Sequence, residues 1–188
     1  MQLADLLAPT YVQMLGALSA WLGKAAEQLP EAEAEALLSK RLADDMFPLA
    51  TQVRFCCVQA LEGMHRLRGE DFPPLVDELL NEGRNAGEQP GTIAEARARL
   101  DQVVAEVRKL AEDMPAGDDD RAVEHALPMG LVFDLTAGQY ARDWALAQFY
   151  FHIMTAYAIL RAEGVDLGKA DYVAHMFQYA RPGTIPGA

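Results

Sequence analysis

The residue best suited to chemistry is His152, which lies in an almost unbroken apolar stretch, FYFHIMTAYAILRAEG, at residues 149–164. Burying an imidazole costs free energy unless a hydrogen-bonding partner, a metal ion or a pocket requires it there. On a helix, Gln148 and Thr155 share a face with His152, because they lie four residues before it and three after it. Two interpretations stay open. Either His152 is a hydrogen-bonded histidine beside a polar pocket, or it pairs with Gln148 as a ligand of a metal ion.

A second polar group, Asp44, Asp45 and Gln52, lies near the start of an earlier helical pattern. Asp45 and Gln52 are seven residues apart, so they can face the same side of a helix. Asp45 is also suited to cap the helix N-terminus. In the functional alternative, Asp45 or Gln52 meets His152 across the bundle, where an Asp–His pair could act as a base and its orienting group. No serine or cysteine stands out as a nucleophile.

The other reactive side chains favour structural roles. Cys56 and Cys57 are adjacent, so on a helix they point about 100° apart and make poor disulfide partners. Mid-helix cysteines of this kind pack as small apolar groups. The remaining histidines are expected to be solvated or to lie at the rim of the core: His65, His125 and His175.

Four long helical patterns must position these residues, over residues 9–29, 45–68, 92–114 and 145–163. Pro9 suits the first turn of the first helix, and Asp45 is expected to cap the second. The third begins with a capping box, Thr92 to Glu95. The fourth ends at Gly164 with the pattern of a Schellman motif. Between the last two, residues 122–137 lose helical periodicity, and residues 130–133 are predicted to form a short strand or an extended crossover.

Length and composition limit the classes of function. A chain of 188 residues with 51% hydrophobic residues fits one domain, predicted over residues 1–180 with a flexible tail at 181–188. The net charge of −12 disfavours nucleic acid and anionic membrane surfaces. The most apolar run, residues 145–160, is shorter than the ~20 residues needed to span a bilayer. No signal peptide is visible, and we expect a cytoplasmic protein.

Two long motifs, RLADDMFPLATQV at residues 41–53 and FYFHIMTAYAILRAEGVDLGKADY at residues 149–172, carry a resemblance to known proteins. The chain resembles a family of uncharacterised bacterial proteins in the DinB-like superfamily. The resemblance implies an all-α four-helix bundle in up-down-down-up order, which is often dimeric. Many members of the superfamily hold nickel or zinc with three histidines, and some use it in transfer or isomerisation reactions that involve low-molecular-weight thiols.

In such metal-binding relatives, a His-x-x-x-His pair precedes a Leu-Arg and a glycine on the fourth helix. Matching on Leu160-Arg161 and Gly164 puts the second histidine at His152 and the first at Gln148, which departs from the pattern. The third ligand comes from the second helix, where only Asp45 or Gln52 stands in a matching place. One histidine of three is present.

The sequence and the resemblance together predict an all-α DinB-like four-helix bundle, with a short extended crossover between helices three and four. The first functional hypothesis is a non-catalytic or small-molecule-binding homodimer without a cofactor, whose metal site has become a polar pocket. Its pocket residues are His152, Gln148, Asp45, Gln52 and Thr155. The second is a nickel- or zinc-dependent thiol transferase or hydrolase that uses His152 as a ligand. The third is a protein that binds partners through its acidic surface.

Overall fold

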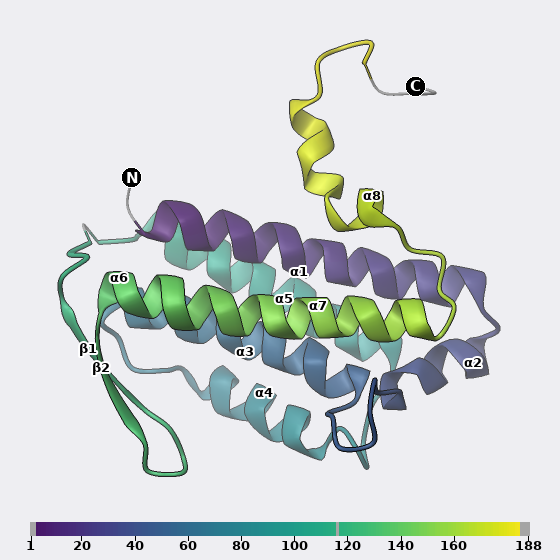
Figure 1. The fold of residues 1–188 in the computed structure, drawn as a ribbon, viewed down its shortest axis with the longest axis horizontal. Helices are drawn as coiled ribbons and strands as arrows, with labels where there is room; N and C mark the ends of the chain where they lie inside the picture. The colour runs from purple at the N-terminus through teal and green to yellow at the C-terminus, as the bar shows by residue number, and fades with distance from the viewer. Residues whose placement is uncertain (1–2, 116, 185–188) are drawn as a thin grey trace.

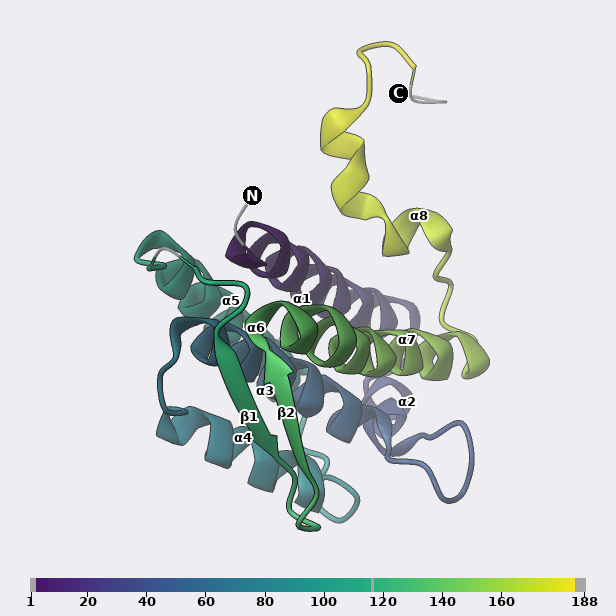
Figure 2. The same ribbon diagram turned by 60° about the vertical axis from the view of Figure 1, so that its left-hand side comes forward.

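The fold is mostly helical, as predicted. The computed structural model describes residues 3–115 and 117–184. Within these ranges four helices are 17 residues or longer: α1 (Leu3–Gln28), α3 (Leu49–Arg68), α5 (Ile93–Glu112) and α7 (Leu146–Ala162). They lie side by side, with α1 against α5 and α7 against α3 (Figures 1 and 2). Their apolar faces meet in one core, whose largest fully buried side chains include Trp21, Tyr11, Tyr140 and Phe149.

Shorter elements connect and flank the long helices. α2 (Glu31–Ala36) and a 3₁₀ turn (Leu37–Ser39) follow α1, and α4 (Pro74–Asn85) lies between α3 and α5. An antiparallel hairpin of β1 (Ala122–Ala126) and β2 (Val132–Thr136) precedes α6 (Ala137–Gln139) and a π-helical turn (Tyr140–Ala145). Within the described residues, the last two elements are α8 (Lys169–Tyr172), which contacts α1, and a 3₁₀ segment (Ala174–Tyr179), which extends away from the long helices in Figure 1. Residues 185–188 of the predicted tail lie outside the described residues.

Two predicted helix boundaries are confirmed in detail. The Thr92 hydroxyl accepts a hydrogen bond from the Glu95 amide at 3.1 Å, and the Glu95 carboxylate accepts one from the Thr92 amide at 2.8 Å. At the end of α7, Gly164 has a φ of 87°, and the Val165 amide donates to the Leu160 carbonyl at 3.0 Å. This is the Schellman geometry, in which glycine adopts the left-handed conformation without steric cost.

The predicted starts of the first two long helices are wrong. α1 already begins at Leu3, so Pro9 lies inside it rather than in its first turn. α3 begins at Leu49 with Pro48 as its N-cap, and Asp45 therefore does not cap it. The reason is Pro48, whose ring disfavours helical backbone in the residue before it and so delays the helix. Asp45 instead lies in an exposed turn.

The last long helix begins earlier than residue 145, because Thr136 and Gln139 form a second capping box. The Thr136 hydroxyl accepts from the Gln139 amide at 3.2 Å, and the Gln139 side chain accepts from the Thr136 amide at 2.9 Å. From Ala137 the helix runs through the π-helical turn into α7. The predicted extended crossover is a complete hairpin, in which Val123 and His125 point inward.

Two large aromatic side chains, Trp21 and Trp144, pack into the core. Trp21 is buried, and its indole Nε1 donates to the Asp171 carbonyl at 3.2 Å. Trp144 is half-buried and packs against His125, with ring centroids 4.3 Å apart. Phe177 is exposed on the C-terminal segment. None of the helices within residues 3–115 and 117–184 is both long enough and apolar enough to span a bilayer.

Candidate functional site

His152 points into the bundle, where its imidazole hydrogen-bonds with one side chain among the described residues. Its Nδ1 lies 2.8 Å from Oε1 of Gln52 on α3, and only 8% of the residue is exposed. The amide nitrogen of Gln52 donates in turn to the Phe47 carbonyl at 3.1 Å. Because this bond directs the Gln52 oxygen toward the ring, Nδ1 carries the proton and donates it, which leaves the lone pair on Nε2.

The surroundings keep the imidazole uncharged. The rings of Phe55 and Phe151 stand edge-on to it, each with centroids 5.3 Å from that of His152. Burial lowers the pKa of His152 to about 4, because charging the ring would require desolvating a cation. At neutral pH His152 is therefore a neutral ring that donates through Nδ1 and accepts through Nε2.

Of the predicted pocket residues, the structure joins only His152 and Gln52 by a hydrogen bond. Asp45 is exposed in the turn before α3, away from the core. Gln148 is half-buried and forms no side-chain hydrogen bond within the described residues. The Thr155 hydroxyl donates to the Phe151 carbonyl of its own helix at 2.7 Å. The alternative in which Asp45 pairs with His152 is wrong, because the helix that was to carry Asp45 starts four residues later.

The donor set around His152 does not fit a nickel or zinc centre. Within the part of the chain that the structure describes, no three His, Cys, Asp or Glu side chains lie close enough to hold one ion. Among the residues described, the side chain that hydrogen-bonds with the imidazole is a neutral amide, whereas these metals prefer imidazole, thiolate or carboxylate. The described side chains around His152 therefore support no metal-dependent reaction step.

The cysteines are buried and free, which confirms their packing role. Burial raises the pKa of Cys57 to about 12, and it raises the pKa of Cys56 as well. Both are neutral thiols at physiological pH, and the thiol is a poor nucleophile. Neither cysteine has the environment of a reactive group.

Sequence reasoning missed a buried polar cluster beneath the hairpin. His125 was expected at the rim, but it is buried, because the alternation of β1 turns it inward against Tyr140 and Trp144. The hydroxyls of Tyr11 and Tyr140 and both ring nitrogens of His125 are buried without a hydrogen-bond partner among the described residues. Burial raises the pKa of the nearby Glu62 to about 7, and Arg66 opposes this rise. One sequence signal near this cluster was overlooked, the Thr136–Gln139 capping box that starts the helix beside it.

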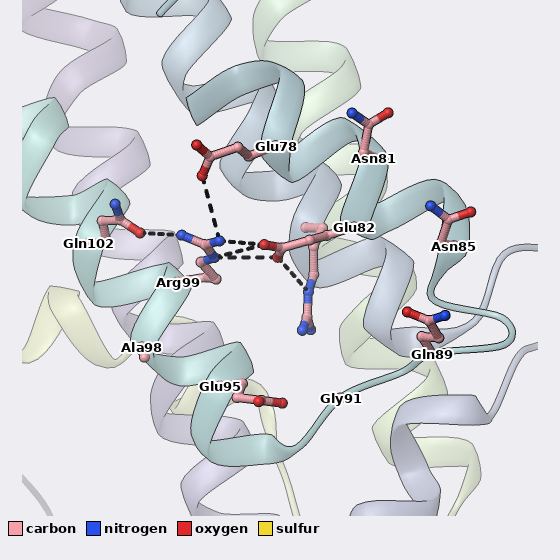
Figure 3. Close-up of a pocket in the computed structure, with 11 residues that line it drawn as sticks. Glu78, Asn81, Glu82, Asn85, Gln89, Gly91, Glu95, Ala98, Arg99 and Gln102 are labelled. Atoms are coloured by element: carbon pink, nitrogen blue, oxygen red, sulfur yellow. Dashed lines mark hydrogen bonds and ion pairs between the residues drawn. The ribbon is translucent and has the colours of Figure 1, made fainter. Parts of the chain in front are cut away.

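Sequence reasoning also missed an open polar cleft of about 840 Å³ between α4 and α5, with Arg54 of α3 in its lining. Figure 3 shows Arg99 bonded to both Glu82 and Gln102, and facing Glu78. The hydrogen bond to Glu82 raises the pKa of Arg99. The residues of α4 and α5 that line this cleft recur at intervals of three and four, but without a structure such a pattern is indistinguishable from a solvated helix face.

Comparison with known proteins identifies the family. Residues 3–173 match the model of a domain of unknown function, DUF1993, so the chain belongs to that family. Its fold is similar to the crystal structure of a DinB family member protein from Shewanella denitrificans, with a TM-score of 0.69 and 31% sequence identity. The match covers 98% of this chain and 96% of the other. A search of curated proteins found no match. The resemblance to an uncharacterised DinB-like family is thereby confirmed.

Proposed function

We propose that this protein is a non-catalytic binding protein of the DinB-like type, in which a hydrogen-bonded pair, His152 and Gln52, replaces the metal centre. The observation that supports this is the 2.8 Å contact between Nδ1 of His152 and Oε1 of Gln52. A side chain that accepts a hydrogen bond from Nδ1 fixes the tautomer and the orientation of the ring. In metal sites, groups that hydrogen-bond to the ligating histidines have the same effect. Here, however, no companion ligands accompany it among the described residues.

The pair leaves one acceptor, the Nε2 lone pair, for a small molecule. Two aromatic side chains near the pair, Phe47 and Phe151, are both more than half exposed, and the ring of Phe151 contacts His152. Phe47 packs against Phe55, which in turn packs against His152. A neutral acceptor beside exposed aromatic rings suits an uncharged aromatic ligand that carries one hydrogen-bond donor. Phenol is the simplest probe of this chemistry.

Metal analysis tests the non-catalytic assignment. Protein purified without an affinity tag or a chelator is expected to contain well under one equivalent of nickel or zinc, and His152→Ala is expected to change nothing. Near-stoichiometric metal that disappears in His152→Ala would contradict the proposal and establish the metal-dependent thiol transferase or hydrolase instead.

Titration with phenol tests the ligand assignment separately. We expect saturable changes in the side-chain NMR signals of His152 and of its partner Gln52, and a loss of the changes at Gln52 in His152→Gln. The variant keeps a donor for Gln52 but has no imidazole acceptor. Absence of any saturable change at His152 would remove the small-molecule pocket from the proposal and leave the pair with a purely structural role.

We further propose a cytoplasmic homodimer with the up-down-down-up helix order of the DinB bundle. Support for the dimer comes from large apolar side chains exposed on the outer face of α7, namely Tyr150, Phe151 and Met154. The C-terminal segment exposes three more, Met176, Phe177 and Tyr179. Apolar groups gathered in this way favour association with a second surface. Sedimentation as a 20.6 kDa species at micromolar concentration would contradict the dimer.

A further inference from the structure

The cleft between α4 and α5 is lined by polar side chains on both sides. Glu78 and Glu82 lie one turn apart on α4, and Glu95 and Arg99 lie one turn apart on α5. Figure 3 shows these side chains directed into the space between the two helices, together with amide side chains of Asn and Gln residues. Two neighbouring helices usually bury apolar faces against each other. Here they present hydrogen-bonding groups to an open volume of about 840 Å³.

Arg54 is the unusual member of this lining. The residue is only 5% exposed, yet its Nε and Nη1 have no hydrogen-bond partner among the described residues. Its nearest anion is Glu82, with Nε and Oε2 separated by 3.6 Å, which is an ion pair but too long for a hydrogen bond. Glu82 is itself engaged by Arg99 through three hydrogen bonds. Arg54 therefore has a charge that is partly balanced and a planar set of donors that is unfilled.

A buried guanidinium with unfilled donors lowers the stability of the fold when no ligand is bound. A buried cation without hydrogen bonds loses its hydration and gains little in return, and an apolar side chain of similar volume is often as stable or more so. Arginine differs from other cations in its rigid fork of donors, which matches the two oxygens of a carboxylate. Either fork of a guanidinium includes Nη2, together with Nε or Nη1, and Nη2 is the nitrogen of Arg54 that lies beside Gly91 in the cleft lining. A carboxylate in the cleft can therefore pair with Nη2, and a small movement of the side chain lets buried Nε or Nη1 complete the fork.

Gly91, in the cleft lining, lies close to the guanidinium. A side-chain Cβ at this position would lie 3.1 Å from Nη2 of Arg54 and 2.8 Å from Oε2 of Glu95. Gly91 also has a φ of 72°, which favours glycine. Both constraints keep the space between a cation and an anion free of side-chain atoms. No direct ion pair between Arg54 and Glu95 closes it.

The charged side chains that line the cleft limit the class of ligand that it can bind. The lining contains three carboxylates, Glu78, Glu82 and Glu95, and two guanidinium groups, Arg54 and Arg99. A simple anion would satisfy Arg54 but would meet an excess of negative charge. A simple cation would suit the excess charge but would leave the donors of Arg54 unfilled.

We propose that this cleft binds a zwitterion, a free amino acid or short peptide, whose carboxylate pairs with Arg54 and whose ammonium group is held by Glu95 or Glu78. The uncharged amides of Asn81, Asn85 and Gln89 extend the cleft, and they can donate to and accept from peptide groups. This site is distinct from the His152 pair, so it does not depend on the proposed function above.

The experiment uses the full chain, labelled with ¹⁵N and titrated at millimolar concentration with each of the common L-amino acids and with dialanine. We expect saturable shifts in the Nε–H signal of Arg54 and in the backbone amide of Gly91. The dipeptide arm distinguishes the two sources, since tighter binding of dialanine than of alanine points to peptides. Blocking the carboxyl group as an amide, or the amino group by acetylation, is expected to weaken binding at least tenfold, because one half of the charge pairing is lost.

Matched variants connect binding to Arg54. Arg54→Met is expected to abolish the shift at Gly91 while the melting temperature stays the same or rises, a combination that a merely structural arginine would not give. Arg84→Met, which removes an exposed arginine from the same α4 helix outside the cleft lining, is expected to bind as the parent does. If Arg54→Met does not fold, Arg54→Lys retains the charge without the fork and is expected to bind at least tenfold more weakly.

The proposal is overturned if none of the probes produces a saturable shift. It is also overturned if acetate binds as tightly as the amino acids, or if binding persists in Arg54→Met. None of these depends on the phenol or metal experiments at His152.

Discussion

Two buried polar side chains on one helix, Gln52 and Arg54, differ completely in how the protein satisfies them. Gln52 uses both ends of its amide, with His152 on one side and the Phe47 carbonyl on the other. Arg54, two residues along α3, leaves Nε and Nη1 without a hydrogen-bond partner in the described part of the chain. A satisfied pair of this kind holds two helices in register, whereas an unfilled buried cation destabilises the fold. Gln52 is thus satisfied within the protein, whereas Arg54 keeps open donors, for which we propose a ligand.

The largest expected effect is the pH dependence of stability that comes from His152, the partner of Gln52. The pKa of His152 is about 4 in the folded protein, below its unfolded value of ~6.5, so the unfolded chain binds the proton first as the pH falls. The stabilisation is complete above pH ~6.5 and is lost progressively down to pH ~4, by about 3 kcal/mol in total. Urea unfolding between these pH values, compared with His152→Gln, measures this difference.

Glu62 has the opposite sign and must be considered in the same experiment. Its folded pKa of about 7 lies above the unfolded value of ~4.3, so its contribution is complete below pH ~4.3 and is lost as the pH rises through 7. The slope of the parent protein therefore combines opposed contributions, because burial also lowers the pKa of His125, which adds a term of the same sign as His152. The difference between the parent and His152→Gln isolates the histidine, and an unchanged slope in that variant would contradict the buried neutral ring.

The next effect breaks the pair itself. Gln52→Leu leaves the His152 Nδ1–H and the Phe47 carbonyl without their partner, which is expected to cost about 2 kcal/mol of unfolding free energy. The double variant Gln52→Leu/His152→Phe removes both polar groups and is expected to recover part of this loss. Chemical denaturation of these two variants and of His152→Phe alone completes a double-mutant cycle. Additive losses would show that the two side chains do not interact.

Removing the unfilled guanidinium of Arg54 is expected to change the unfolding free energy by a smaller amount and in the opposite direction. Arg54→Met is expected to leave the unfolding free energy unchanged or to raise it by about 1 kcal/mol, because it removes a buried charge while Glu82 keeps its bonds to Arg99. Thermal unfolding of this variant beside Arg84→Met supplies the control for arginine removal in general. A loss of several degrees in Arg54→Met alone would place Arg54 among the groups that stabilise the fold.

The smallest effect concerns the cluster beneath the hairpin. The Tyr11 hydroxyl is buried without a partner among the described residues and lies 2.3 Å from the place a Cβ on Gly63 would occupy. Tyr11→Phe removes an unsatisfied group from a tight space, so a change within about 0.5 kcal/mol is expected. A loss near 2 kcal/mol in denaturation would mean that the hydroxyl has a bonding partner, such as an ordered water molecule.

Local signals made much of the fold predictable from the sequence. The Thr92 capping box and the Gly164 stop depend on residues within a few positions of each other, so both were found. The start of the last long helix was missed because the π-helical turn, Tyr140–Ala145, interrupts the 3.6-residue periodicity. The start of α3 was misplaced because Pro48 outweighed the capping propensity of Asp45.

The sites were less accessible to sequence reasoning, because they depend on contacts between distant segments. The inward direction of His152 follows from its apolar neighbours, and Gln52 was one of two partners considered. The burial of Arg54 could not be predicted from the sequence, since a single arginine in a helix is usually a surface residue. Only the packing of α4 against α3 buries it, with Gly83 of α4 close to the Arg54 Cβ. Whether a buried polar group is satisfied cannot be read from a pattern along the chain.

The most direct test of the central claim is a long-range ¹H–¹⁵N NMR spectrum of the His152 imidazole at neutral pH, in untagged and chelator-free protein, before and after one equivalent of Ni²⁺. The hydrogen bond to Gln52 predicts a neutral ring protonated at Nδ1, with signals that the metal leaves unchanged. A ring protonated at Nε2, or His152 signals that disappear through paramagnetic broadening on addition of Ni²⁺, would contradict it.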